Sequence, residues 1–187
     1  MIDNPSQETH VSRAQAGDVL AFTELYWTHR NQIRKYLAHL VSHHDQWPDL
    51  DQETFLPAWR SLPELCCAHQ FTSWFYCIAH NRAMSFLREV EREKKHHQRL
   101  SDDEEYSSNT HPSTPGPEEQ VAEEDWLKRA LRGLEPQCRD CLLLYVVGFS
   151  QREIATMLGI HESTISANVC RGRKYLRSCK SLEKRDL

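Results

Sequence analysis

Cysteine and histidine are the residues of this chain whose types and spacing could support metal or thiol chemistry. Cys138 and Cys141 have the C-x-x-C spacing of half a zinc site, but a structural zinc site needs four ligands and no second pair follows. On a helix the two cysteines share a face with Leu142 and Tyr145, which favours small buried thiols over metal ligands. Other candidates for a metal- or redox-sensing role are Cys66 and Cys67 with His69, His43 with His44, and Cys170 with Cys179.

Motifs that carry catalysis in other proteins are missing from this sequence. It has no glycine-rich phosphate loop, no G-x-S-x-G nucleophile elbow and no H-E-x-x-H metal motif. Its 6 glycines in 187 residues leave little room for a loop that cradles a cofactor. We therefore expect no enzyme activity, no catalytic residue, no metal site and no cofactor.

Residues 150–177 predict two helices joined by a tight turn. Ser150 and Glu153 have the spacing of a capping box, and Gly159 stands where a helix end favours a left-handed residue. The second helix starts near His161 and carries short polar residues first and arginines later. A helix, a glycine turn and such a second helix are typical of the DNA-reading helix-turn-helix. The alternative, from these residues alone, is a plain helical hairpin in a bundle.

The elements that would position this motif are also helices. Apolar residues recur at three- and four-residue steps, no segment alternates as a strand would, and we expect no strands. The predicted helices cover residues 11–41, 49–62, 71–95, 121–134 and 136–147. Pro57 is unusual in the second of them, because a proline inside a helix removes one hydrogen bond and tends to kink the helix. The eight residues after that helix, 63–70, are predicted to form a loop.

An acidic segment separates two groups of helices. Residues 101–117 contain acids, Ser, Thr and three prolines with almost nothing to bury, which predicts a disordered linker. The formal net charge of the chain is -4, yet residues 82–100 sum to +3, residues 101–125 to -9 and residues 161–187 to +4. Phosphates respond to local charge within a Debye length, so the two basic segments are compatible with nucleic-acid binding.

Composition also suggests a compartment. The mean hydropathy is -0.69, no apolar run approaches the ~20 residues of a membrane span, and the first ten residues lack the features of a secretion signal. Seven cysteines, an odd number, are then more consistent with reduced thiols than with disulfides. We expect a cytoplasmic protein.

Two separated blocks resemble bacterial RNA polymerase sigma factors of the extracytoplasmic-function (ECF) group. DLDQETFLPAW, followed by FTSWFYCIAHN and a basic helix, is similar to their region two. LRGLEPQCRDCLLLYVVGFSQREIATMLGI, followed by RGRKYLR, is similar to their region four. The resemblance implies an all-α chain of two small helical domains. These are a region two bundle at residues 10–98 and a region four helix-turn-helix at 119–180, joined by a flexible acidic linker at 99–118.

The resemblance implies roles for residues of region two. The helix matching Asp49 to Trp59 would bind a coiled coil of the large polymerase subunits, through Asp49, Leu50, Gln52, Glu53 and Phe55. The segment matching Phe71 to Arg88 would read and melt the promoter's minus-ten element, whose bases must leave the stack. Its candidate residues are Ser73, Trp74, Asn81, Arg82 and Arg88. The helical spacing of Phe71, Trp74, Phe75 and Ile78 favours the core for these four, and His80 is expected at the surface.

In region four, the resemblance places the second helix in the major groove of the minus-thirty-five element. Its candidate contacts are Ser163, Thr164, Ser166, Ala167, Arg171, Arg173 and Lys174. The chain departs from the family pattern at His161, where a serine-like cap is common, and at Ser166 and Asn168, where basic residues often occur. The linker is interpreted either as a solvated spacer or as a mimic of nucleic acid inside a basic polymerase channel.

These features favour an ECF-type sigma factor with no chemistry of its own. Its expected partners are core RNA polymerase, through the coiled coil and flap elements of the large subunits, then promoter DNA and an anti-sigma factor; no membrane insertion is expected. The alternative is a stand-alone helix-turn-helix regulator with an N-terminal sensing or dimerisation domain. The DLDQETF block separates the two hypotheses, because a sensor domain has no need of it.

Overall fold

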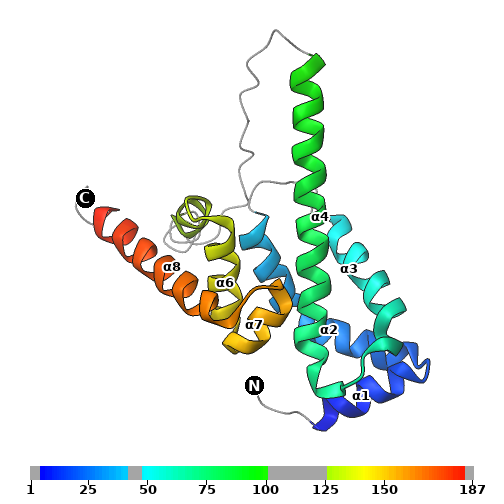
Figure 1. The fold of residues 1–187 in the computed structure, drawn as a ribbon. Helices are drawn as coiled ribbons and strands as arrows, with labels where there is room; N and C mark the ends of the chain where they lie inside the picture. Colours follow the sequence, from blue (N-terminus) through cyan, green and yellow to red (C-terminus); the bar gives the residue numbers. More distant parts are fainter. Residues whose placement is uncertain (1–4, 42–47, 101–125, 184–187) are drawn as a thin grey trace.

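The computed structural model describes residues 5–41, 48–100 and 126–183, and every regular element in these ranges is a helix (Figure 1). The N-terminal half contains α1 (Pro5–Gln15), α2 (Val19–Leu40), α3 (Pro48–Ser61), two 3-10 turns, η1 (Leu62–Glu64) and η2 (Ala68–Gln70), and α4 (Phe71–Leu100). The C-terminal half contains a helical segment at residues 126–132, then α6 (Pro136–Val147), α7 (Gln151–Leu158) and α8 (Glu162–Glu183). The all-α prediction is confirmed. Residues 101–118 of the predicted linker lie outside the described ranges.

The prediction of one helix over residues 11–41 is wrong, because two helices meet there. Gly17 has a φ of +96°, a left-handed conformation that glycine adopts without strain. Asp18 then caps α2, since its side chain accepts hydrogen bonds from the backbone N–H groups of Leu20 and Ala21. The hydrogen bonds from Ala21 and the Arg13 guanidinium lower the pKa of Asp18. The chain therefore turns between α1 and α2.

Aromatic side chains hold α2, α3 and α4 together. The ring centroid of Phe55 on α3 lies 5.0 Å from Phe22 and 4.9 Å from Tyr26, both on α2. On α4, Phe71 and Phe75 are fully buried, as their spacing predicts. Trp74 is half-buried, with its ring centroid 5.6 Å from that of Phe71. The aromatic start of α4 is therefore mainly core.

The C-terminal half confirms the helix-turn-helix. The hydroxyl of Ser150 accepts from the backbone N–H of Glu153, whose carboxylate accepts from the Ser150 N–H at 2.8 Å. Gly159 ends α7 with a φ of +64°. Further along α8, a Cβ at Gly172 would lie 3.1 Å from Cδ2 of Leu142, so this glycine lets α8 approach α6 closely.

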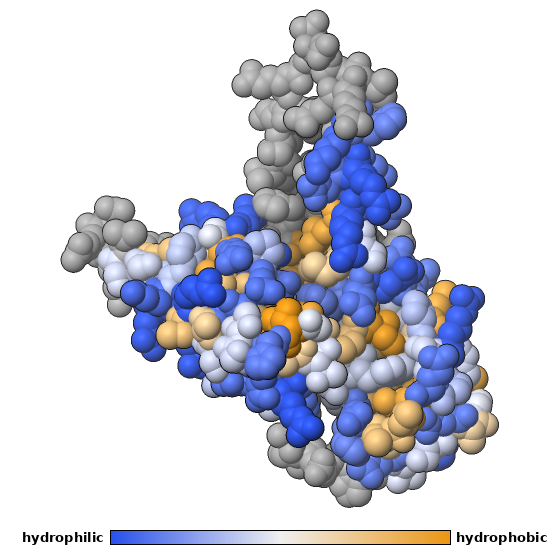
Figure 2. Space-filling model, in the orientation of Figure 1, coloured by the Kyte–Doolittle hydropathy of each residue, from blue (hydrophilic) through white to orange (hydrophobic). Residues whose placement is uncertain are grey.

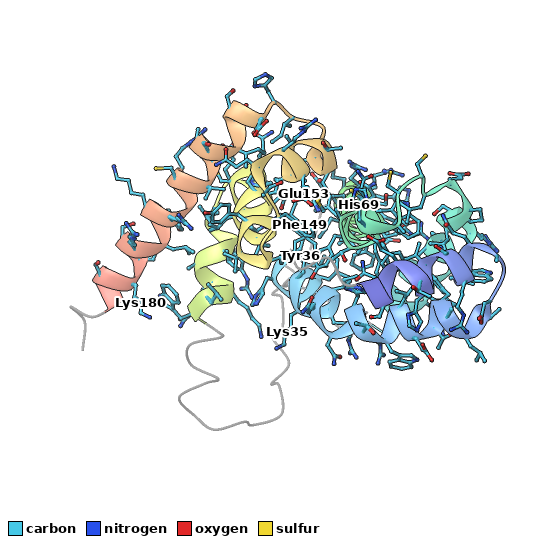
Figure 3. All side chains as sticks on the ribbon, turned by 90° about the horizontal axis from the view of Figure 1, so that it is seen from below. Lys35, Tyr36, His69, Phe149, Glu153 and Lys180 are labelled. Atoms are coloured by element: carbon cyan, nitrogen blue, oxygen red, sulfur yellow. The ribbon has the colours of Figure 1, made fainter. Side chains whose placement is uncertain are left out.

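The two halves pack against each other in the described conformation. Helix α6 contacts α2 and α7 contacts α4, and one continuous apolar core runs through both halves. The ring centroids of Tyr76 on α4 and Phe149, just before α7, lie 5.0 Å apart. Figure 3 shows Tyr36 of α2 and Phe149 where the halves meet. Among the described helices, none has the length and apolar character that a membrane span requires.

Candidate polymerase-binding and DNA-binding surfaces

The exposed face of α3 carries part of the predicted polymerase-binding set. Gln52 and Glu53 are exposed, whereas Phe55 is half-buried against α2 and serves packing. Asp49 and Leu50 belong to α3, but their side chains lie outside the described part of the chain. Leu56, four residues after Gln52 and on the same side, has half of its surface exposed. Sequence reasoning missed Leu56, although its spacing from Gln52 could have indicated it.

Pro57 lies inside α3, which continues without a break to Ser61. A proline has no backbone N–H, so the carbonyl of Glu53, four residues earlier, loses its helical partner. The guanidinium of Arg82 on α4 donates from Nε to that Glu53 carbonyl oxygen at 3.1 Å. Arg82, predicted from the resemblance as a DNA residue, therefore also links α4 to α3 at the proline.

Three of the predicted minus-ten residues share one side of α4. Trp74, Asn81 and Arg88 follow each other at intervals of seven residues, which on a helix places them in one row about 21 Å long. Asn81 and Arg88 are exposed, and the hydroxyl of Ser73 donates to the carbonyl of Gln70 at 3.0 Å. Figure 2 shows that the outer part of α4 has a hydrophilic surface. Ser73 and Arg82 lie on either side of this row.

His80 corrects a prediction, because its side chain is buried instead of exposed. Only 6% of its surface is accessible, and its Nδ1 lies 2.8 Å from the hydroxyl of Tyr36. Burial, with Arg139 and Arg88 nearby, lowers the pKa of His80 to about 4. The imidazole is therefore neutral at pH 7, and sequence reasoning missed it because Tyr36 is 44 residues away.

The predicted minus-thirty-five residues lie along the solvent side of α8. Those with exposed side chains are Ser163, Ser166, Ala167, Arg171, Arg173 and Lys174, and Thr164 is half-buried. Beside them is a groove of about 450 Å³ lined by Tyr145, Gln151, Ser166, Val169, Cys170, Arg173, Lys174 and Arg177. Arg177 is a further cation of this surface, beyond the predicted set. The groove and the exposed row together form a basic surface fit for phosphates.

Several of these side chains are held in place by neighbours. The His161 ring Nδ1 accepts from the backbone N–H of Ser163 at 3.3 Å and lies 2.8 Å from the Ser163 hydroxyl, so His161 itself caps α8. The hydroxyl of Ser166 donates to Oε1 of Gln151 at 2.7 Å. The guanidinium of Arg173 lies over the Tyr145 ring, 4.6 Å from its centroid. Neighbouring side chains thus hold several residues on the exposed side of α8.

Asn168 explains one departure from the family pattern. Its side chain is buried, where it accepts from the Cys138 thiol at 3.5 Å and donates to the Cys141 sulfur at 3.6 Å. It also accepts from the Arg171 guanidinium at 3.0 Å. Cys138 and Cys141 are buried thiols, as predicted, and burial raises the pKa of both. Across the described ranges, no group of three or more His, Cys, Asp and Glu residues could hold a metal ion.

Comparison with known proteins matches both halves. The family model for sigma-70 region 2 matches residues 25–93, and that for sigma-70 region 4 matches residues 124–176. The ECF RNA polymerase sigma-E factor of Haemophilus influenzae is 27% identical over 183 residues, 94% of this chain and 96% of that protein. The RNA polymerase sigma factor CarQ of Myxococcus xanthus is 30% identical over 172 residues, 89% of this chain and 93% of that protein. The chain belongs to the ECF sigma factors.

A solved structure has the same fold as this ECF sigma factor. The sigma factor RpoE of Bartonella quintana, in complex with the anti-sigma factor NepR, superposes with a TM-score of 0.71 and 26% identity. The match covers 87% of this chain and 98% of that one. The region 2 match starts inside α2, so α1 lies outside it. The family resemblance noted in the sequence is confirmed.

Proposed function

We propose that this ECF sigma factor binds core RNA polymerase and directs initiation from specific promoters, while the polymerase performs the chemistry. The observation that carries the proposal is that one chain matches both region 2 and region 4. We assign region two to residues 10–98, the linker to 99–118 and region four to 119–180. A stand-alone regulator is less well supported, because it has no use for a polymerase-binding region two.

In this proposal the face of α3 contacts the polymerase coiled coil. Gln52 and Glu53 supply exposed polar groups, and Leu56 adds apolar area beside them. Asp49 and Leu50 belong to the same helix and are included on the family resemblance. Phe55 acts indirectly, since it packs α3 against α2.

The two DNA surfaces take different parts of the promoter. The row of Trp74, Asn81 and Arg88 on α4, with Ser73 beside it, offers polar contacts to bases and a cation for phosphate, as single-stranded minus-ten DNA requires. The exposed side of α8 offers short polar side chains, with Arg171, Arg173 and Lys174, to a major groove. Each surface belongs to a different half of the chain.

The two promoter elements lie too far apart for both DNA surfaces to reach them at once in the described conformation. Elements named minus-ten and minus-thirty-five differ by about 25 base pairs, or about 85 Å of duplex. In the described conformation α4 contacts α7, and the ring of Tyr76 on α4 packs against Phe149, just before α7. Residues 101–125 can span at most about 90 Å when extended, which is enough to let the halves separate. We therefore propose that the packed arrangement is a resting state and that promoter binding separates the halves.

An anti-sigma factor is the expected regulator. The similar RpoE of Bartonella quintana was solved in complex with the anti-sigma factor NepR, and this chain shares its fold over most of its length. We propose that a partner of this kind holds the present chain away from polymerase. The site of action is then the cytoplasm, where polymerase and promoters are.

Reconstitution tests the proposed function directly. The purified chain is added to sigma-free core polymerase, and transcripts are scored from DNA upstream of its own gene and from a panel of genomic fragments. Specific initiation that depends on the chain is expected. Binding to such DNA without polymerase, with no gain in initiation, would instead establish the stand-alone regulator.

A further inference from the structure

The chain between α3 and α4 is braced by α1, which the region 2 match does not cover. This connection comprises η1, Leu65 to Cys67, and η2, and α1 contacts both 3-10 turns. Figure 1 shows α1 alongside the point where α4 begins. Short 3-10 turns have poor hydrogen-bond geometry and do not fix a loop well by themselves. The loop therefore depends on what packs against it.

Gln15, the last residue of α1, holds the start of this loop. Its side-chain amide donates from Nε2 to the carbonyl of Leu62 at 3.2 Å and to the carbonyl of Leu65 at 2.7 Å. Both N–H donors of the amide are thus used on the loop backbone. Leu65 leaves η1 in an extended conformation, so its carbonyl is where the chain changes direction. Gln15 fixes that change of direction.

Gln7, two turns earlier on α1, holds the other end. Its Nε2 donates to the hydroxyl of Thr72 in the first turn of α4 at 3.3 Å, and its Oε1 lies 3.2 Å from Nε2 of His29 on α2. Eight residues on a helix put Gln7 and Gln15 on one side, about 12 Å apart. Val11 and Ala14, between them on that side, are buried. The face of α1 thus consists of an apolar centre with one glutamine at each end of the loop.

We infer that Gln15 and Gln7 are positioning residues that shape the loop of residues 62–70 for a base extruded from the minus-ten element. The loop leads into the first turn of α4, where the hydroxyl of Ser73 donates to the carbonyl of Gln70 beside the α4 row, and the side chains of Cys66, His69 and Gln70 are exposed on the loop. A flipped base is read by a pocket whose polar groups are already in place. The backbone of residues 62–70, which α1 holds at both ends, can keep its polar groups in place in this way. The inference rests on the proposed sigma function.

The test uses variants of Gln15 that separate its donors from its bulk. Gln15→Met keeps the size and helix propensity of the side chain and removes both donors, whereas Gln15→Lys keeps a donor of similar reach. Gln32→Met, at an exposed position of α2, is the matched control. Each full-length variant is bound to core polymerase, and open complexes are measured on the promoter found by reconstitution and on versions with single minus-ten bases replaced.

Gln15→Met is expected to lower the preference for the cognate minus-ten base by about tenfold, because two hydrogen bonds are removed. Gln15→Lys is expected to recover most of that preference, and Gln32→Met to retain it. Affinity for core polymerase should stay within about twofold, since α3 is unchanged. On a template with abasic minus-ten positions, Gln15→Met and the parent should melt equally well.

Two results would overturn the inference. In one, Gln15→Met keeps full base preference while the parent chain initiates normally. In the other, Gln15→Met and Gln15→Lys lose activity alike, and equally on the abasic template, which would make Gln15 a residue of general stability. Failure of the parent chain to initiate on any fragment contradicts the proposed function itself and is seen before any variant is made.

Discussion

At Pro57 in α3, a side chain from another helix replaces a missing backbone hydrogen-bond donor. Pro57 leaves the Glu53 carbonyl without its helical donor, and Arg82 supplies one from a different helix. A proline inside a helix is ordinarily costly for this reason. The sequence alone predicts the defect at Pro57, but its remedy is 25 residues further on and depends on how α4 packs. The family resemblance assigned Arg82 to DNA binding. Its hydrogen bond to the Glu53 carbonyl on α3 could not be predicted from the spacing of residues in the sequence.

A double-mutant cycle tests the link between Arg82 and Pro57. Arg82→Ala should lower the free energy of unfolding by about 1 kcal/mol, because the Glu53 carbonyl loses its donor. In a Pro57→Ala background the residue 57 N–H can bond to that carbonyl, so Arg82→Ala should cost much less. Urea unfolding of the four proteins measures both costs. Equal costs in the two backgrounds would show that Arg82 does not compensate for the proline.

Asp140 provides a pH-dependent prediction at the contact between the halves. It is buried, its Oδ1 has no hydrogen-bond partner among the residues that the structure describes, and Arg139 Nε lies 3.6 Å from it. Burial raises the pKa of Asp140 to about 6, against the opposing effect of Arg139. The folded pKa is above the unfolded one, so the stability from this group is full below pH 4 and is lost as pH rises through about 6.

Asp140→Asn removes that titration. The free energy of unfolding of the variant, relative to the parent, should therefore increase by about 2 kcal/mol between pH 4.5 and pH 8. Urea unfolding at several pH values measures the difference. A difference that stays constant across this range would mean that Asp140 is not desolvated.

Helices with local signals were predictable, and their long-range contacts were not. The capping box of Ser150 and Glu153 and the turn at Gly159 follow from residues a few positions apart, and the structure has both. The break between α1 and α2 was missed because the apolar steps continue across Gly17 and Asp18. His80 was misjudged, and the burial of Asn168 was not predicted, because their partners come from other helices. Burial of a polar residue depends on those distant partners.

On α8, Arg171→Ala with Lys174→Ala is expected to lower promoter affinity and to reduce the slope of log affinity against log salt by about 2, one for each phosphate that is no longer neutralised. Filter binding or fluorescence anisotropy of the polymerase complex at several salt concentrations measures the slope. Lys35, exposed on α2, gives the matched control Lys35→Ala. An unaltered slope would show that these residues of α8 do not contact the DNA phosphates.

On α3, reversing the charges with Asp49→Lys and Glu53→Lys is expected to weaken binding to core polymerase by about tenfold or more, because complementary charge is removed. The helix should persist, because the Glu53 side chain is exposed and only its carbonyl bonds to Arg82. Circular dichroism checks the fold and competition with another sigma factor measures affinity. Glu64→Lys, exposed on η1, is the control for net charge. Unchanged affinity would contradict the core-binding assignment.

The whole molecule joins the two proposed DNA-binding surfaces through a single continuous core. Tyr76, Phe149 and the pair of Tyr36 and His80 lie where α2 and α4 meet α6 and α7. No pattern within either half predicts this packing, because neither half carries a local signal for the other. The family resemblance predicted two domains and their order along the chain, but not how they pack against each other.

Energy transfer between dyes at Thr28 on α2 and Thr156 on α7, both exposed, tests the separation of the halves. Non-natural amino acids carry the dyes, since the chain has seven cysteines. The free chain should show high transfer, and the complex with polymerase and promoter should show a separation larger by several tens of ångströms. High transfer in complexes that initiate transcription would contradict a resting state.

The packing of the halves has a thermodynamic consequence. If promoter binding needs the separated form, the apparent affinity of the free chain for DNA is its intrinsic affinity multiplied by the small fraction that is separated. Polymerase that binds only the separated form increases that fraction. By reciprocity, promoter DNA then strengthens polymerase binding by the same factor. The contact between Tyr76 and Phe149 would thus make the two ligands bind cooperatively, although they need not touch each other.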